Sequence, residues 1–203
     1  MKILFIHASA GAGHFKAAEA LYGGVKKLNR HDVVFVDALD YSSPFFKKLY
    51  TGTYFFLISK MPRLWGWCFG VLDIACLQPL VRFVRRVYNG LNTRKLHQFL
   101  CDEQFDYIFS THFLSTEVSC ALKRSGKIAS RVVTIITDYD VHKIWLADGV
   151  DHYVVATDWT KGKLRNLGVD ENRILACGIP TDQKFSVVAD TNALKMKLGL
   201  PWG

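Results

Sequence analysis

Short apolar runs rich in Val, Ile and Phe alternate along the chain with stretches in which apolar residues recur at helical spacing. The apolar runs predict buried strands, and the periodic stretches predict helices. The predicted strands are residues 2–8, 33–36, 106–110, 131–137, 152–156 and 173–176. The predicted helices are residues 14–29, 115–124 and 159–166. This alternation indicates an α/β fold with a Rossmann-like parallel sheet and helices on both faces.

Small or polar residues directly follow several of the predicted strands. A turn of small residues, 9–13, follows the first strand, Thr111 and His112 follow the third, and Thr137 and Asp138 follow the fourth. Ligands of open parallel sheets bind outside the carboxyl ends of the strands. We therefore expect these positions to form one ligand site.

Residues 44–90 break the alternation, because they combine many aromatic residues with seven Lys or Arg and a single Asp. Such a segment suits a membrane interface, where aromatic rings sit at headgroup depth and cations meet anionic lipid. No run within it reaches the roughly 20 apolar residues needed to cross a bilayer, so we expect it to lie on the membrane. The alternative is a set of helices whose aromatics fill the core and whose cations are merely solvated. The predicted contact residues are Phe45, Phe46, Lys47, Lys48, Phe55, Phe56, Trp65, Trp67, Arg82, Arg85 and Arg86.

Charge and cysteine content narrow the class of protein. A net charge of +8 makes an anionic partner plausible, whether a lipid surface, a nucleic acid or a phosphorylated ligand. No nucleic-acid-binding motif accompanies this charge, so we expect no nucleic-acid partner. The five scattered cysteines include no CxxC pair, and the first apolar run is too short for a signal peptide. We expect a protein on the cytoplasmic side.

The turn before the first predicted helix contains Gly11 and Gly13 and leads into His14. Small residues there permit close approach of a ligand, and the free N–H groups of a helix N-terminus favour a polar or anionic group. Lys16 stands where a dinucleotide-binding motif needs its third glycine, and no Walker lysine is present, which disfavours NAD and ATP. The helix dipole disfavours protonation of His14 and makes it a candidate base; bracing of the loop is the alternative role.

A second polar cluster follows the most strongly apolar strand. It contains Asp138, Asp140, His142 and Trp145, more polar chemistry than a connecting loop needs. One histidine beside two aspartates is a common arrangement, and we expect no metal site here.

These motifs, in this order and spacing, resemble the N-terminal domain of the monogalactosyldiacylglycerol synthase family, which includes processive diacylglycerol glucosyltransferases and belongs to glycosyltransferase family 28. The resemblance rests on five features: the glycine-rich turn with His14, the sequence 17–21, Thr111 with His112, the cluster 137–145, and Gly178-Ile179-Pro180-Thr181 leading to Phe185. Ala12 interrupts the glycine cluster that many relatives have.

The resemblance implies a GT-B fold whose N-terminal domain binds a diacylglycerol-like lipid at an anionic membrane, while a C-terminal domain binds the UDP-sugar. It implies transfer of a hexose with inversion, and neither a catalytic metal nor another cofactor. His14 matches the position of the base or its partner, with Asp138 in support. The residues implied to line the acceptor site are Gly11, Gly13, His112, His142 and Trp145.

The resemblance also implies a division of the chain. Residues 1–185 form the acceptor-binding domain, including the membrane-contact insertion 44–90, and residues 186–203 form a linker and the start of a UDP-sugar-binding domain. We expect a peripheral membrane protein that is inactive without a donor-binding domain. Whether the chain acts as an enzyme stays open, because a non-catalytic membrane-anchoring subunit of a split glycosyltransferase is the alternative.

Overall fold

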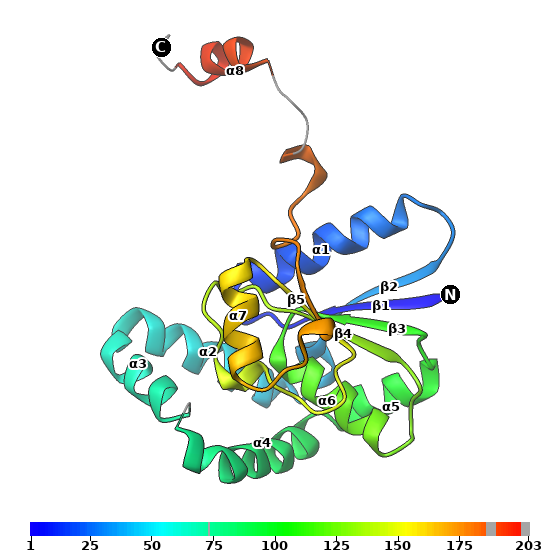
Figure 1. Cartoon of the computed structure of the whole chain (residues 1–203), viewed down its shortest axis with the longest axis vertical. Helices are drawn as coiled ribbons and strands as arrows, with labels where there is room; N and C mark the ends of the chain where they lie inside the picture. Colours follow the sequence, from blue (N-terminus) through cyan, green and yellow to red (C-terminus); the bar gives the residue numbers. More distant parts are fainter. Residues whose placement is uncertain (73, 186–189, 200–203) are drawn as a thin grey trace.

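The structure is a computed structural model that describes residues 1–72, 74–185 and 190–199. Its centre is a parallel sheet with the strand order β2-β1-β3-β4-β5-β6 (Figure 1). The strands are β1 (Lys2–His7), β2 (Asp32–Asp37), β3 (Tyr107–Ser110), β4 (Arg131–Ile135), β5 (His152–Val155) and β6 (Ile174–Ala176). Each predicted strand is present within one or two residues of its predicted bounds, which confirms the predicted fold class.

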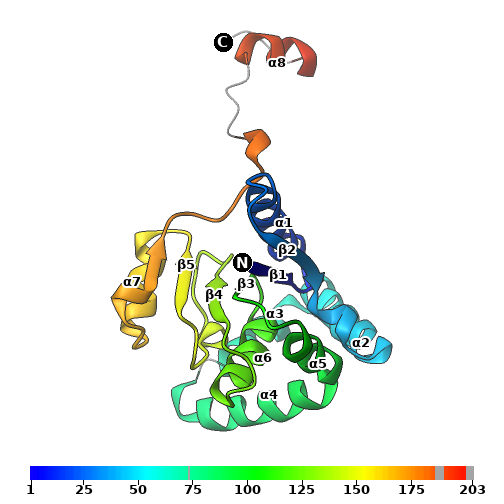
Figure 2. The same ribbon diagram turned by 90° about the vertical axis from the view of Figure 1, so that its right-hand side faces the viewer.

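Helices cover both faces of the sheet. Successive side chains of a strand point to opposite faces. On one face, Leu4 and Ile6 of β1 pack with Leu96 of α5 (Arg94–Glu103) and Val118 of α6 (Phe113–Arg124). On the other face, the ring of Phe5 meets Tyr22 of α1 (Ala12–Lys26). Figure 2 shows α1 and α6 on opposite sides of the strands.

The insertion between β2 and β3 is helical throughout most of its length. It contains α2 (Pro44–Lys60), α3 (Pro62–Val71) and α4 (Gln78–Asn92), each with a proline in its first turn, where the absent N–H costs nothing. The side chain of Ser43 caps α2 by accepting a hydrogen bond from the Phe46 N–H. In Figure 1, α2 and α3 lie beyond the carboxyl ends of the strands. None of the helices among the described residues has a stretch long and apolar enough to span a bilayer.

Two further helices lie in the second half of the chain. These are α7 (Asp158–Asn166), whose N-terminus is capped by Thr157, and α8 (Thr191–Leu198), which buries no residue. The 3-10 segments are Ala38–Tyr41, Ala75–Leu77, Lys143–Trp145, Glu171–Arg173 and Gln183–Phe185. The predicted boundary after residue 185 meets residues 186–189, which, like residues 200–203, lie outside the described residues. The division into domains therefore stays a prediction.

Candidate active site

The candidate site lies where the strand order reverses. From β1 the chain crosses to β2 on one side and later returns to β3 on the other, which opens a crevice at the carboxyl ends of β1 and β3. A cavity of about 860 Å³ occupies this place. It is lined by Ala10, His14, Leu49, Tyr50, Thr53, Tyr54, Leu57, Trp65, Leu72, Tyr88, His112, Phe113, Thr137, Asp138, Tyr139, Asp140, His142, Ile144 and Trp145. The polar residues after three different strands thus meet, as their positions predicted.

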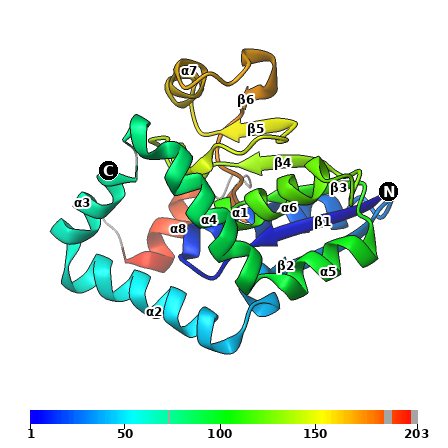
Figure 3. The ribbon, with the colours of Figure 1, turned by 90° about the horizontal axis from the view of Figure 1, so that it is seen from below.

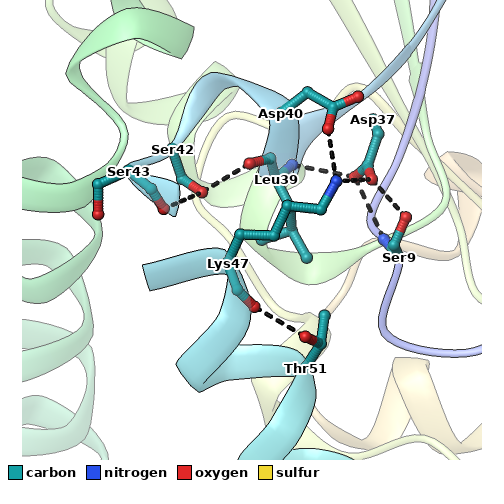
Figure 4. A network of polar contacts seen from close by, with 8 residues as sticks. All are labelled: Ser9, Asp37, Leu39, Asp40, Ser42, Ser43, Lys47 and Thr51. Carbon is teal, nitrogen blue, oxygen red and sulfur yellow. Dashed lines mark hydrogen bonds and ion pairs between the residues drawn. The ribbon is translucent and has the colours of Figure 1, made fainter. Parts of the chain in front are cut away.

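Asp37, at the end of β2, holds the first residue of the glycine-rich turn. Its carboxylate accepts hydrogen bonds from the N–H and the hydroxyl of Ser9, from the N–H of Leu39 and from the Lys47 ammonium (Figure 4). Burial opposes ionisation of Asp37, but these bonds and the nearby positive charge outweigh it and lower its pKa. The turn then passes through Gly11, whose φ of 145° is a conformation that residues with a side chain rarely adopt.

His14 lies in the first turn of α1 and is held at both its backbone and its ring. The Thr111 hydroxyl donates to the backbone oxygen of His14 at 2.8 Å, and the hydroxyl oxygen of Thr137 lies 2.9 Å from Nδ1 of the ring. Burial lowers the pKa of His14 below its usual value, although the negative charge of Asp138 opposes this shift. The imidazole is therefore neutral near pH 7, the state in which it can accept a proton.

His112 lies edge-on to His14, with ring centroids 4.9 Å apart. Its side chain caps α6, because Nδ1 accepts the N–H of Leu114 at 3.2 Å. His112 is almost fully buried, and burial holds its pKa well below the usual histidine range. A neutral, fixed imidazole thus forms part of the cavity wall beside His14.

The remaining predicted site residues come from the loop after β4. The indole N–H of Trp145 donates to Oδ2 of Asp138 at 2.8 Å, and Nδ1 of His142 accepts the N–H of Ile144 at 3.1 Å. Trp145 is buried, and its ring centroid lies 5.9 Å from that of His14. Gly11 and Gly13, by contrast, are not among the residues that line the cavity. Within residues 1–72, 74–185 and 190–199, no group of three or more His, Cys, Asp or Glu is placed to hold a metal ion.

The cavity has two chemically different parts. Imidazoles, hydroxyls and carboxylates gather at the strand ends, whereas α2, α3 and α4 supply apolar and aromatic side chains such as Leu57, Trp65 and Tyr88. Burial raises the pKa of Tyr50, on α2, so its phenol stays neutral. A ligand that fills the whole cavity must therefore combine a polar group with a long apolar portion. The sequence pattern did not single out the α2 residues as lining, because their aromatic spacing is equally typical of a core.

The predicted membrane-contact residues fall into two groups. Phe45 (76% exposed), Phe55, Phe56 and Trp67 (68% exposed) have large exposed surfaces, and Lys48 is exposed as well. Phe46, in contrast, is 2% exposed and packs in the core with Ala8, Leu39 and Leu114. Trp65 is half-buried in the cavity wall. The side chains of Arg82 and Arg86 lie outside what the structure describes.

Two predicted contact cations are instead engaged inside the protein. Lys47 pairs with Asp37 and Asp40. Arg85 donates to Glu117 Oε2 of α6 at 2.7 Å, and only 17% and 14% of the two side chains are exposed. These two cations are therefore neither at a membrane-contacting surface nor merely solvated, as the alternative expected, because both form ion pairs within the protein.

Helix α4 turns polar side chains inward and apolar side chains outward. Arg85 and Asn89 both bond to Glu117, at 2.7 and 3.0 Å. Four apolar residues that share one face of the helix are all exposed, namely Leu80, Phe83, Val84 and Val87. This is the reverse of the usual orientation of an amphipathic surface helix. Figure 3 shows α4 on the outside of the molecule, across α6.

Known proteins are similar to this chain in sequence and in fold. The family described as monogalactosyldiacylglycerol (MGDG) synthase matches residues 14–181. Processive diacylglycerol beta-glucosyltransferases of Bacillus licheniformis and Bacillus cereus are 27% and 28% identical over 98% of this chain. That of Bacillus subtilis is 27% identical over 91%. The chain spans about half the length of these relatives.

A solved structure also matches nearly the whole chain. The crystal structure of Anabaena Alr3699/HepE in complex with UDP has a TM-score of 0.50 and 13% identity, over 98% of this chain and 50% of that one. At this identity the match shows a shared fold, the Rossmann-like half predicted for a GT-B protein. The family match over residues 14–181 shows that this chain belongs to the monogalactosyldiacylglycerol synthase family.

Proposed function

We propose that this chain is the acceptor-binding part of an inverting glycosyltransferase that moves a hexose from a UDP-sugar to diacylglycerol or a related membrane lipid. The observation that carries the proposal is the cavity in which a neutral His14 faces an apolar wall from α2 and α3. The names of the Bacillus relatives supply diacylglycerol as the acceptor and glucose as the sugar that they transfer.

In this proposal His14 is the base. Its imidazole removes the proton of the lipid hydroxyl while that oxygen forms a bond to the anomeric carbon. The bond between the anomeric carbon and UDP breaks, and UDP leaves with the bonding electrons. The UDP-sugar is held by a second domain outside this chain, in the full-length protein or in a separate subunit. Holding the leaving diphosphate is a large part of such catalysis, so this chain alone is expected to show no turnover.

The outer surface of the insertion, defined by Phe45, Phe55, Phe56, Trp67 and the apolar side of α4, is proposed to rest on the cytoplasmic side of an anionic membrane. The chain carries a net charge of +8, and the insertion contributes seven Lys or Arg against one Asp, although Lys47 and Arg85 among them are paired within the protein. Each Lys or Arg near an anionic leaflet contributes about 1 kcal/mol of attraction. The cavity is lined by the inner sides of α2, α3 and α4, so a lipid has a short path from the membrane to His14.

The catalytic part of the proposal is tested in a full-length protein that includes the UDP-sugar-binding domain. His14→Gln is expected to lower kcat by about 100-fold or more, the contribution typical of a general base. His97→Gln, on α5 and away from the cavity lining, is the matched control and is expected to retain turnover. Retained turnover in His14→Gln would remove His14 from the mechanism.

The membrane part is tested on this chain by flotation with phosphatidylcholine vesicles, with and without phosphatidylglycerol, at low and high salt. Binding is expected to need the anionic lipid and to weaken as salt rises. Phe83→Ser and Trp67→Ser are expected to reduce flotation. Trp159→Ser changes an aromatic ring of similar exposure on α7 and is expected to leave flotation unchanged. Equal flotation of all three variants would contradict the proposed surface.

A further inference from the structure

The direct side-chain partner of the His14 ring is a hydroxyl rather than a carboxylate, and the Thr111 backbone also hydrogen-bonds to the ring and opposes the lowering of its pKa. Oγ1 of Thr137 lies 2.9 Å from Nδ1 of His14, across 123 positions of the chain. Asp138, the next residue, influences His14 through its charge, but Asp138 is exposed and its Oδ2 is bonded to the Trp145 indole. Thr137 follows Ile136, which is fully buried and joined to β5 through its N–H, so the hydroxyl lies in the loop after β4 directly next to a residue anchored to the sheet.

The hydrogen bond between Thr137 and His14 has two possible directions with opposite chemical consequences. A neutral imidazole has one N–H and one nitrogen that accepts. If the Thr137 hydroxyl donates to Nδ1, Nε2 carries the proton and cannot act as a base. If Nδ1–H donates to Oγ1, Nε2 has a free lone pair. Only the second tautomer can take a proton from a substrate hydroxyl.

We propose that Thr137 is the positioning residue for His14: it accepts a hydrogen bond from Nδ1–H and so keeps Nε2 unprotonated as the basic atom. This inference rests on the proposed role of His14 as the base. It gives two neighbouring residues of the loop after β4 different roles. Thr137 sets the tautomer and the orientation of the ring by direct contact. Asp138 stabilises the protonated imidazole through its charge after the proton has moved.

Thr111 supplies a matched control for this inference. Its hydroxyl also bonds to His14, at 2.8 Å, but to the backbone oxygen rather than the ring. Replacing either threonine by valine removes one hydroxyl with little change of volume. A general disturbance of the first turn of α1 would follow from both substitutions, whereas a change of tautomer should follow from Thr137→Val alone.

The experiment is NMR of this chain with 15N-labelled histidine, in which the shifts of the two ring nitrogens report the tautomer directly. The His14 signals are assigned by their loss in His14→Gln. The wild type, Thr137→Ser and Thr111→Val are expected to show a protonated Nδ1 and an unprotonated Nε2. Thr137→Val is expected to shift the population toward the Nε2–H form. A wild type with Nε2 protonated, or a Thr137→Val variant with an unchanged tautomer, would overturn the inference.

A second readout uses the full-length protein with its UDP-sugar-binding domain. Thr137→Val is expected to lower kcat by about tenfold or more with little change in KM, because the wrong tautomer still binds substrate but cannot remove its proton. Thr137→Ser is expected to restore kcat. The two readouts separate the possible failures. If His14→Gln retains turnover while Thr137→Val changes the tautomer, the proposed base is wrong and the hydrogen-bond assignment stands.

Discussion

The indole N–H of Trp145 lies 2.8 Å from Oδ2 of Asp138 and donates a hydrogen bond to it. Trp145 is 1% exposed and packs in the core with Ile136, Val141 and Val150. The bond therefore ties an exposed carboxylate at the mouth of the cavity to the rigid interior. It fixes the loop after β4, on which the contact between Thr137 and His14 depends.

Replacing Trp145 by Phe tests this tie. The variant keeps an aromatic ring in the core but loses the N–H, so we expect the free energy of unfolding to fall by about 2 kcal/mol, from the lost bond and the smaller ring. Chemical denaturation of Trp145→Phe, Asp138→Ala and the double variant isolates the pair, because alanine leaves no oxygen to accept the indole N–H. A coupling energy of about 1 kcal/mol is expected, and strict additivity would show that the bond contributes nothing.

The buried His112 predicts a dependence of stability on pH. Its pKa in the folded state is well below the usual 6.5, so below that pH the unfolded chain binds a proton that the folded chain does not. Stability should therefore fall as the pH drops below about 6.5, by up to about 1.4 kcal/mol per pH unit for this one group. His112→Asn keeps a side chain that can cap α6 but cannot titrate. Thermal unfolding between pH 5 and 8 should show a shallower slope for this variant, and an identical slope would contradict the assignment.

The buried carboxylate of Asp37 is expected to contribute to stability, and Asp40 serves as its control. Both residues contact Lys47 but differ in burial. Asp37→Asn places an amide N–H₂ among the donors Ser9, Leu39 and Lys47, and we expect a loss of about 2 to 3 kcal/mol at pH 7. Asp40 is largely exposed, and Asp40→Asn is expected to cost less than about 1 kcal/mol. Urea denaturation gives both values.

The pKa of Asp37 is lowered in the folded state, so its stabilising effect is present above the unfolded value of 3.8 and is lost as the pH falls through the folded pKa. The difference between Asp37→Asn and the wild type should therefore shrink below about pH 4. A difference that stays constant down to pH 2 would argue that the charge of Asp37 is not what holds the turn.

The bond between Arg85 and Glu117 is expected to hold α4 in its reversed orientation. Glu117→Gln keeps the shape but removes the charge, and we expect it to lower the free energy of unfolding by about 2 kcal/mol and to weaken flotation with anionic vesicles. Glu19→Gln removes the charge from an exposed pair with Lys16 and serves as the control. Equal effects of the two substitutions would show that the inward pair has no special role.

Much of the fold could be predicted because each strand coincides with a short apolar run in the sequence. Apolar runs such as 131–137 are long enough to specify a buried parallel strand by themselves. The rule that ligands bind at the carboxyl ends of strands then brought His14, His112 and Asp138 together without any knowledge of their distances.

Features that depend on distant partners could not be predicted. Nothing near Arg85 in the sequence indicates its pairing with Glu117, 32 positions away, which turns the Arg85 side chain inward. Helix α5 was not predicted, because its ten residues bury only Leu96 and Leu100, too few to give a clear periodic signal. Thr137 was recognised as part of the loop but not as the partner of the His14 ring, since its neighbour Asp138 has the more familiar chemistry.

The central claim, that the cavity beside His14 binds a lipid with a free hydroxyl, is tested most directly by titrating the 15N-histidine-labelled chain with diacylglycerol in phosphatidylcholine nanodiscs. We expect saturable changes in the signals of His14 and His112, which line the cavity, and none for His31 and His152, which do not. Triacylglycerol, which lacks the hydroxyl, should not reproduce the change at His14. Unchanged signals from His14 and His112 at saturating diacylglycerol, or the same change with triacylglycerol, would show that this cavity does not bind the acceptor hydroxyl.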